Sequence, residues 1–142
     1  MAGESKFEVE ILTPEGEVFS GEVSQVSTRT AGGEIGILAN HAPLLAALRP
    51  AELRLYEGDT GGEPRRYAQA HGWLQVFGNH ARLLVEEAIP PEDLEAAALK
   101  EQLADAEQRL ADSEEGSAAR SRAEKDRDRA EAFLAITRAS GV

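Results

Sequence analysis

The sequence contains no cysteine in its 142 residues. This absence excludes a disulfide framework and a metal site built on thiolates. No stretch approaches the roughly 20 consecutive apolar residues of a membrane-spanning helix, and the N-terminal segment MAGESKFEVE lacks the apolar core of a signal peptide. The sequence therefore predicts an intracellular chain that reaches a membrane only through a partner.

Basic residues are outnumbered, because 15 Lys and Arg residues stand against 26 Asp and Glu residues, for a formal net charge of −11. Nucleic-acid binding depends on a basic face that displaces counterions from phosphates, so this balance argues against a nucleic-acid partner. Hydrophobic residues make up 42% of the chain and charged residues 29%. Such a composition and length are typical of a globular protein with one domain or two small ones.

The common catalytic and phosphate-binding motifs are also missing. No G-x-x-x-x-G-K-[ST], G-x-S-x-G or H-E-x-x-H occurs, and the glycines of GGEIG do not match a dinucleotide-binding fingerprint. Glu86 and Glu87 are adjacent, so on a strand they point to opposite faces and cannot act as an acid/base pair. Three histidines are scattered without the spacing of metal ligands: His41, His71 and His80. We therefore expect no metal, no cofactor and no catalytic residue.

Apolar residues up to about residue 87 follow a period of two. Phe7, Val9 and Ile11 alternate with glutamates, which predicts a strand with one solvent-exposed face. Further short strands are predicted at residues 23–28, 35–38, 53–56, 67–70, 73–77 and 81–86. Many short strands separated by turn residues are typical of an antiparallel sandwich or barrel, which we assign to residues 1–88.

From residue 90 the apolar period becomes helical. The segment PPED suits a helix start, because prolines are tolerated there and acids are favoured in the first turn. One helix then carries its apolar seam at Ala96, Leu99, Leu103, Ala106 and Leu110, and a second, which Ser117 can cap, at Ala119, Ala123, Ala130, Phe133 and Ile136. Asp126 interrupts the second stripe. Residues 89–142 are thus predicted to form an antiparallel α-helical hairpin.

The two arms of this hairpin differ in charge. Residues 90–115 hold nine acids and two bases, whereas residues 116–142 hold four acids and six bases. The second arm carries a basic cluster, predicted to be a solvated face or a docking face for an acidic partner: Arg120, Arg122, Lys125, Arg127 and Arg129. The seams contain few leucines and bury little apolar area. We therefore expect that only a small free energy holds the hairpin in one docked position.

The segment EIGILANHAPLLAALRP, residues 34–50, combines a carboxylate, an imidazole and an apolar run. The apolar residues are predicted to plug one end of the sandwich: Ala42, Leu44, Leu45 and Leu48. Glu34 and His41 look exposed, so the segment is either a docking surface or a small reaction site.

Three stretches carry a family resemblance: TPEGEVFSGEV, GEIGILANHAPLLAALRPAELRL and HGWLQVFGNHARLLVEEA, followed by the two-helix tail. Together they resemble the epsilon subunit of bacterial F-type ATP synthase. The resemblance implies an α+β fold, with a flattened sandwich of about ten strands followed by the hairpin. It also implies a non-catalytic rotor subunit of the central stalk, bound to the gamma subunit and the c ring at the cytoplasmic face of the bacterial inner membrane, which couples c-ring rotation to ATP synthesis.

The resemblance assigns roles to particular residues. It implies c-ring contact by Glu34, Ile35 and Gly36, and gamma contact by His41, Ala42 and Pro43. It further implies that the hairpin moves into the catalytic alpha and beta subunits and inhibits ATP hydrolysis through its basic cluster. Some relatives bind ATP with an I/L-D-x-x-R-A motif, which is degenerate here at Glu95, Ala98 and Leu99. Since the phosphate-pairing arginine is lost, no ATP binding is expected.

Two other functions fit the residues without the resemblance. One is an independent β-sandwich module that binds a ligand and dimerises through its helices. The other is a small enzyme that uses Glu34 and His41.

Overall fold

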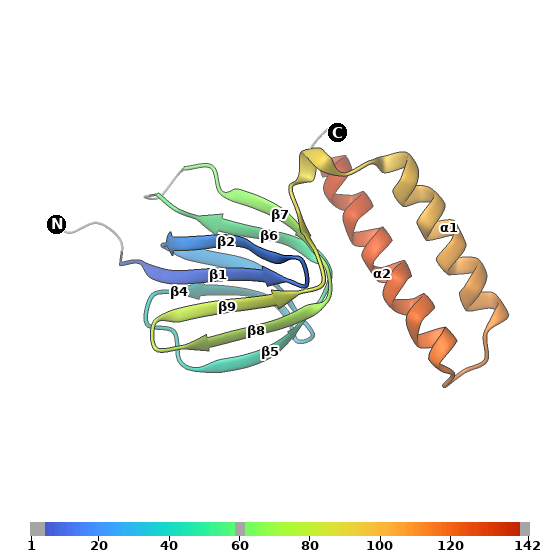
Figure 1. Ribbon diagram of the computed structural model, residues 1–142, viewed down its shortest axis with the longest axis horizontal. Coiled ribbons are helices and arrows are strands. Elements are labelled where there is room, and N and C mark those ends of the chain that lie inside the picture. Colours follow the sequence, from blue (N-terminus) through green and yellow to red (C-terminus); the bar gives the residue numbers. More distant parts are fainter. Residues whose placement is uncertain (1–4, 59–61, 140–142) are drawn as a thin grey trace. The chain divides into compact units, whose positions relative to one another are not determined.

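The computed structural model describes residues 5–58 and 62–139 (Figure 1). The segment EGDTGGEP, residues 57–64, for which the sequence predicts a flexible hairpin tip, lies partly outside the described residues. The chain divides between Ile89 and Pro90 into a unit built of strands and a unit built of helices. The predicted fold class, a β-sandwich followed by an α-helical hairpin, is confirmed.

The described part of the first unit contains ten strands. They are β1 Phe7–Thr13, β2 Gly16–Val23, β3 Gln25–Thr30, β4 Gly33–Leu38, β5 Leu44–Leu48, β6 Ala51–Tyr56, β7 Arg65–Gln69, β8 Gly72–Phe77, β9 His80–Val85 and β10 Ala88–Ile89. Hydrogen-bonded neighbours follow the order β10-β7-β6-β3-β5-β8-β9-β1-β2, with β4 also beside β3. The pairing is antiparallel as predicted, except that β1 and β9 run parallel.

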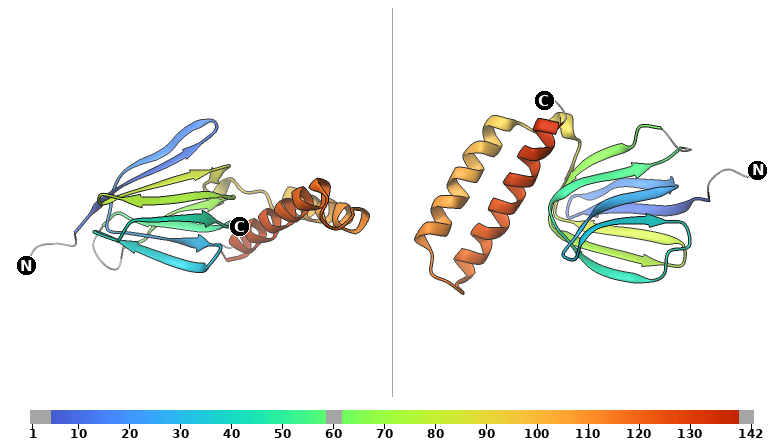
Figure 2. Two further views of the ribbon diagram at one scale, coloured as in Figure 1. Left: turned by 90° about the horizontal axis from the view of Figure 1, so that it is seen from below. Right: turned by 180° about the vertical axis from the view of Figure 1, so that it is seen from behind.

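The sheet folds into two layers because β3 and β5 share a single residue pair, Thr30 with Leu48. One layer holds β10, β7, β6, β3 and β4, and the other holds β5, β8, β9, β1 and β2 (Figure 2). The alternation predicted for β1 is confirmed, since Phe7, Val9 and Ile11 are buried between the layers with apolar residues from both of them. A single apolar core therefore joins the two layers.

Two hairpins at one end of the sandwich use the same turn, Thr-x-x-Gly. The Thr13 hydroxyl accepts from the Glu15 N–H (3.2 Å) and donates to the Gly16 carbonyl (3.2 Å). The Thr30 hydroxyl likewise accepts from the Gly32 N–H and donates to the carbonyl of Gly33, which has φ +121°. A positive φ favours glycine, so this turn fixes where β4, and with it Glu34, begins.

A buried polar link stabilises the first layer. Gln69 is fully buried; its amide oxygen accepts from the Thr28 hydroxyl (2.7 Å), and its amide nitrogen donates to the Arg49 carbonyl (2.7 Å). Both polar ends of the Gln69 amide are therefore satisfied, as a buried amide requires. The link joins β3 and β7 to the loop before β6.

Three strands were not predicted from the sequence: β2, β5 and the two-residue β10. Residues 16–23 form edge strand β2, whose residues are mostly exposed, so no clear alternation of buried and exposed positions marks it. The prediction that residues 42–48 plug the sandwich is wrong in part: residues 44–48 form strand β5, in which Leu48 is buried but Leu45 is 68% exposed. Ala42 is exposed as well. In a segment that is apolar at every position, the sequence does not reveal which residues face outward.

The second unit contains η1 (Pro91–Asp93), α1 (Ala96–Asp112) and α2 (Ala118–Ala139). PPED forms the short 3-10 turn η1 rather than the first turn of α1. Ser117 caps α2 as predicted, because its hydroxyl accepts from the Arg120 N–H (3.1 Å). Of the predicted seams, Leu99, Ala106, Ala123, Ala130, Phe133 and Ile136 are buried, whereas Ala119 is exposed.

Candidate docking surfaces

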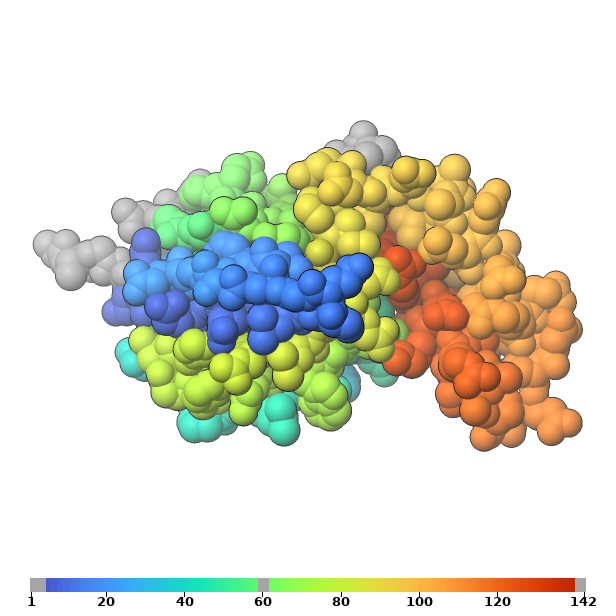
Figure 3. Space-filling view, in the orientation of Figure 1, coloured from blue at the N-terminus to red at the C-terminus, as the bar shows by residue number. Residues whose placement is uncertain are grey.

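The outer face of β5, β8, β9 and β1 carries an apolar row that crosses all four strands. Leu12 on β1 lies opposite Leu84 on β9, and Leu84 lies opposite Trp73 on β8. Trp73 in turn lies opposite Ala47 on β5. Trp73 is 53% exposed and Leu84 43% exposed. Figure 3 shows this face, with β1 and β2 in blue beside β8 and β9 in yellow-green.

A second row on the same face is mostly polar. It runs from Glu10 on β1 through Arg82 and Gln75 to Leu45 on β5. His80, one row further along β9, also contacts Glu10, because its Nε2 atom lies 2.9 Å from Glu10 Oε1. The hydrogen bonds from His80 and from Arg82 (3.2 Å) hold the pKa of Glu10 below its usual range, so the carboxylate stays ionised.

Phe77 borders this charged cluster and extends the apolar area. Its ring stacks on the His80 ring with centroids 5.2 Å apart, and the Arg82 guanidinium lies 5.6 Å from its centroid. Leu45, Trp73, Phe77 and Leu84 together form what we call the apolar face. Exposed apolar side chains that gather beside a polar rim are typical of protein-binding surfaces. The apolar face was not predicted from the sequence, since its members lie on three strands.

The loop that holds His41 leads into β5, the strand that carries Leu45. Asn40 has φ 63°, a left-handed conformation that asparagine tolerates. Its N–H donates to the Asn79 side chain (2.7 Å), which also donates to the Lys6 carbonyl (3.2 Å) and so ties the loop to the β8–β9 turn. His41 is half-buried, with Nδ1 2.7 Å from the Ala42 carbonyl, whereas Ala42 and Pro43 are exposed.

Glu34 lies at the other end of β4, next to the Thr-x-x-Gly turn. It is exposed, Ile35 is half-buried, and Gly36 is exposed opposite Ser27. The six residues of β4 separate this end from the loop of His41, and a strand of that length spans about 20 Å. The structure therefore does not bring Glu34 and His41 together, which argues against the small enzyme.

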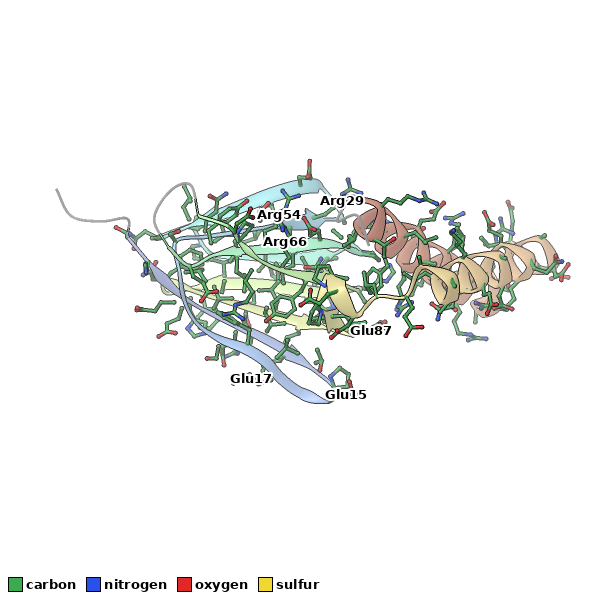
Figure 4. The ribbon with its side chains drawn as sticks, turned by 90° about the horizontal axis from the view of Figure 1, so that it is seen from above. Glu15, Glu17, Arg29, Arg54, Arg66 and Glu87 are labelled. Atoms are coloured by element: carbon green, nitrogen blue, oxygen red, sulfur yellow. The ribbon has the colours of Figure 1, made fainter. Side chains whose placement is uncertain are left out.

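Charged side chains are distributed unevenly over the sandwich. Figure 4 shows Arg29, Arg54 and Arg66 on one side and Glu15 and Glu17 on the other. Arg54 pairs with Glu52 (2.6 Å), and the hydrogen bond that Arg54 donates to Glu52 raises the pKa of Arg54. Arg66 reaches the same carboxylate at 3.9 Å and Glu63 at 3.3 Å. Nearby carboxylates thus compensate the positive charges of Arg54 and Arg66.

The basic residues of α2 divide into two groups. Some are engaged within the hairpin: Arg120 donates to the carbonyls of Leu110 (3.0 Å) and Ser113 (3.4 Å), and Arg129 donates to Gln102 (2.9 Å). Arg127 pairs with acids of its own helix, Asp128 and Glu131. Arg122 and Lys125 are exposed.

The remaining positions singled out in the sequence lie near the start of α1. Glu95 is exposed just before the helix, Ala98 is half-buried, and Leu99 is buried. Within residues 5–58 and 62–139, no group of three His, Cys, Asp or Glu side chains is placed to hold a metal ion. No helix in that part of the chain is long and apolar enough to cross a membrane.

Comparison with known proteins places this fold in a family. Residues 6–91 match the family model described as the ATP synthase delta/epsilon chain β-sandwich domain. The chain is 41% identical over 103 residues to the ATP synthase epsilon chain of Persephonella marina, covering 72% of this chain and 74% of the relative. It is 38% identical over 106 residues to that of Brevibacillus brevis, covering 74% and 78%. The chain belongs to the ATP synthase epsilon-chain family.

Two solved structures share the fold beyond the matched domain. One is a chain of the Euglena gracilis mitochondrial ATP synthase, in a structure of OSCP, F1 and c-ring, with TM-score 0.77 and 22% identity over 95% of this chain and 83% of that chain. The other belongs to the central stalk and c-ring of the Tetrahymena thermophila mitochondrial ATP synthase, with TM-score 0.63 and 18% identity over 96% and 99%. At these identities the likeness concerns the fold alone.

Proposed function

We propose that this chain is a non-catalytic rotor subunit of a bacterial, proton-translocating F-type ATP synthase. It binds the gamma subunit and the c ring at the cytoplasmic face of the membrane and couples c-ring rotation to ATP synthesis. The observation that supports this proposal is the apolar face, a group of exposed apolar side chains in a chain of the epsilon family. A subunit that acts by contact needs such a surface and needs no catalytic group.

The apolar face is the proposed gamma-binding site, together with His41, Ala42 and Pro43. Trp73 supplies a large rigid side chain at the centre of the apolar row, which is the kind of residue that dominates binding energy at interfaces. The Glu10 cluster beside it supplies charges at the rim, where they favour correct orientation.

The proposed c-ring contact is the opposite end of β4, with Glu34, Ile35 and Gly36. The Thr-x-x-Gly turn makes this end short and well defined. The His41 loop and Glu34 lie at opposite ends of β4, and the apolar face lies on the other layer of the sandwich, so the sandwich can hold gamma and the c ring simultaneously. A rigid sheet between the two contacts suits the transmission of torque.

The hairpin is the proposed regulatory element. In an extended position it would enter the catalytic alpha and beta subunits and slow ATP hydrolysis. Arg122 and Lys125 are exposed on α2, and we propose that they meet an acidic segment of the beta subunit. Arg120 and Arg129 first have to leave their partners on α1 and in the turn.

Deletion of residues 116–142 tests the regulatory part. The chain is reconstituted with its own gamma and catalytic subunits, and steady-state ATP hydrolysis is measured with the full chain and with the truncated chain. We expect hydrolysis to rise several-fold on truncation, while binding to gamma is retained through the intact sandwich. Equal hydrolysis with both chains would show that the hairpin does not inhibit in this protein.

A further inference from the structure

In the part of the hairpin nearer the turn, helices α1 and α2 meet through small side chains and are joined by polar groups. The buried contact residues include Ala106 on α1 and Ala123 and Ala130 on α2, which bury little apolar area. Side-chain bonds cross the interface where Arg129 donates to Gln102 (2.9 Å) and where Arg109 donates to Asp126 (2.7 Å). Larger buried side chains, Leu99, Phe133 and Ile136, lie further from the turn, so these polar links join the helices where their apolar contact is smallest.

Arg109 is the centre of this polar contact. Its Nε donates to Asp105 (2.8 Å), one turn earlier on α1, while its Nη2 donates to Asp126 on α2. These hydrogen bonds, the one to Asp126 first and the one to Asp105 second, raise the pKa of Arg109. Asp126 is the residue that interrupts the apolar stripe of α2, between Ala123 and Ala130. The interruption thus has a structural reason, because it places a carboxylate opposite Arg109.

We propose that Arg109, held between Asp105 and Asp126, is a clasp that keeps the hairpin closed and sets how readily α1 and α2 separate. Opening the hairpin breaks the Asp126 bond but leaves the Asp105 bond, which lies within one helix. The clasp therefore acts on the closed state alone. Its regulatory meaning rests on the proposed function, since only a separated α2 could reach far into the catalytic subunits.

The side chains of the clasp are about half exposed, at 41% for Arg109 and 54% for Asp126. Exposed ion pairs contribute little individually, so the expected effect of removing one partner is about a 2- to 5-fold change in the open population. An effect of this size suits a switch that a partner must be able to overcome. It is also measurable, because opening is read directly from amide exchange.

Native-state hydrogen exchange on the isolated full chain tests the clasp. We expect Arg109→Ala and Asp126→Ala each to raise exchange of α1 and α2 amides about 2- to 5-fold, with sandwich amides unchanged. The double alanine variant should exchange like either single variant. The charge-swapped pair, Arg109→Asp with Asp126→Arg, is made together with Asp105→Ala, which removes the like charge one turn before residue 109. It should return exchange toward the wild-type rate.

Two variants serve as controls. Arg122→Ala removes an exposed arginine that has no ion-pair partner among the described residues, and Asp105→Ala removes the partner within α1 but keeps Asp126. The proposal is overturned if Arg109→Ala raises exchange no more than Arg122→Ala does. It is equally overturned if the charge-swapped pair exchanges as fast as the single variants.

ATP hydrolysis by the reconstituted complex tests the regulatory role of the clasp independently of hairpin opening. If the clasp and the inhibitory function are both right, the Arg109→Ala chain inhibits ATP hydrolysis more strongly than the wild-type chain does. The charge-swapped pair then returns inhibition to the wild-type level. If exchange responds as expected but hydrolysis does not, the clasp stands and the inhibitory function fails.

Discussion

Replacing Trp73 with glutamate is expected to weaken binding of this chain to its gamma subunit at least about 30-fold, because a central tryptophan in an interface commonly contributes 2 kcal/mol or more. Trp73 stands 53% exposed in the middle of the apolar row, between Leu84 and Ala47. A carboxylate there would be desolvated against the partner without a compensating charge. Isothermal titration of purified gamma with the variant chain measures the loss.

Leu38→Glu is the matched control for this experiment. Leu38 is 58% exposed, but it lies on β4, in the other layer of the sandwich. The same kind of change at a similar exposure should leave the affinity for gamma within about 2-fold, because it lies outside the proposed interface. If both variants bind gamma as the wild-type chain does, the apolar face is not the gamma-binding site.

Gly72→Ala is expected to lower the free energy of unfolding by about 3 kcal/mol, an effect near the upper end for overpacking. A Cβ atom at Gly72 would lie 2.0 Å from the Leu84 carbonyl oxygen and 2.7 Å from the Val85 Cα. Both obstacles are backbone atoms of β9, so no side-chain rotation can relieve the clash. Strand β9 would have to move away from β8, which would displace Leu84 from Trp73.

The corresponding measurement is urea unfolding of the variant, with Gly58→Ala as the control. A Cβ atom at Gly58 meets no atom of the described residues within 4 Å, so this change should alter the free energy of unfolding by no more than about 0.5 kcal/mol. Two variants of equal stability would mean that β8 and β9 do not approach as closely as the structure shows.

The elements that the sequence predicted well are those with local signals. Alternation at Phe7, Val9 and Ile11 identified β1 and its buried face, and the change of period at residue 90 identified the hairpin. These features depend on neighbours in the chain, so a single sequence contains the information.

The apolar face could not be predicted in the same way. The alternation of Trp73 with Leu74 shows only that the two side chains point in opposite directions. That Trp73 lies opposite Leu84 and Ala47 depends on strand register, which the sequence does not reveal locally. The same holds for the clasp, because Asp126 was visible as an interruption but its partner Arg109 is 17 residues away.

ATP-driven proton pumping is the most direct test of the rotor function. The catalytic head, gamma and the c ring are assembled in vesicles with and without this chain, and acidification is compared with the rate of ATP hydrolysis. The proposed function predicts that hydrolysis continues without the chain while acidification is lost, and that added wild-type chain restores it. Equal acidification per ATP with and without the chain would contradict a coupling role.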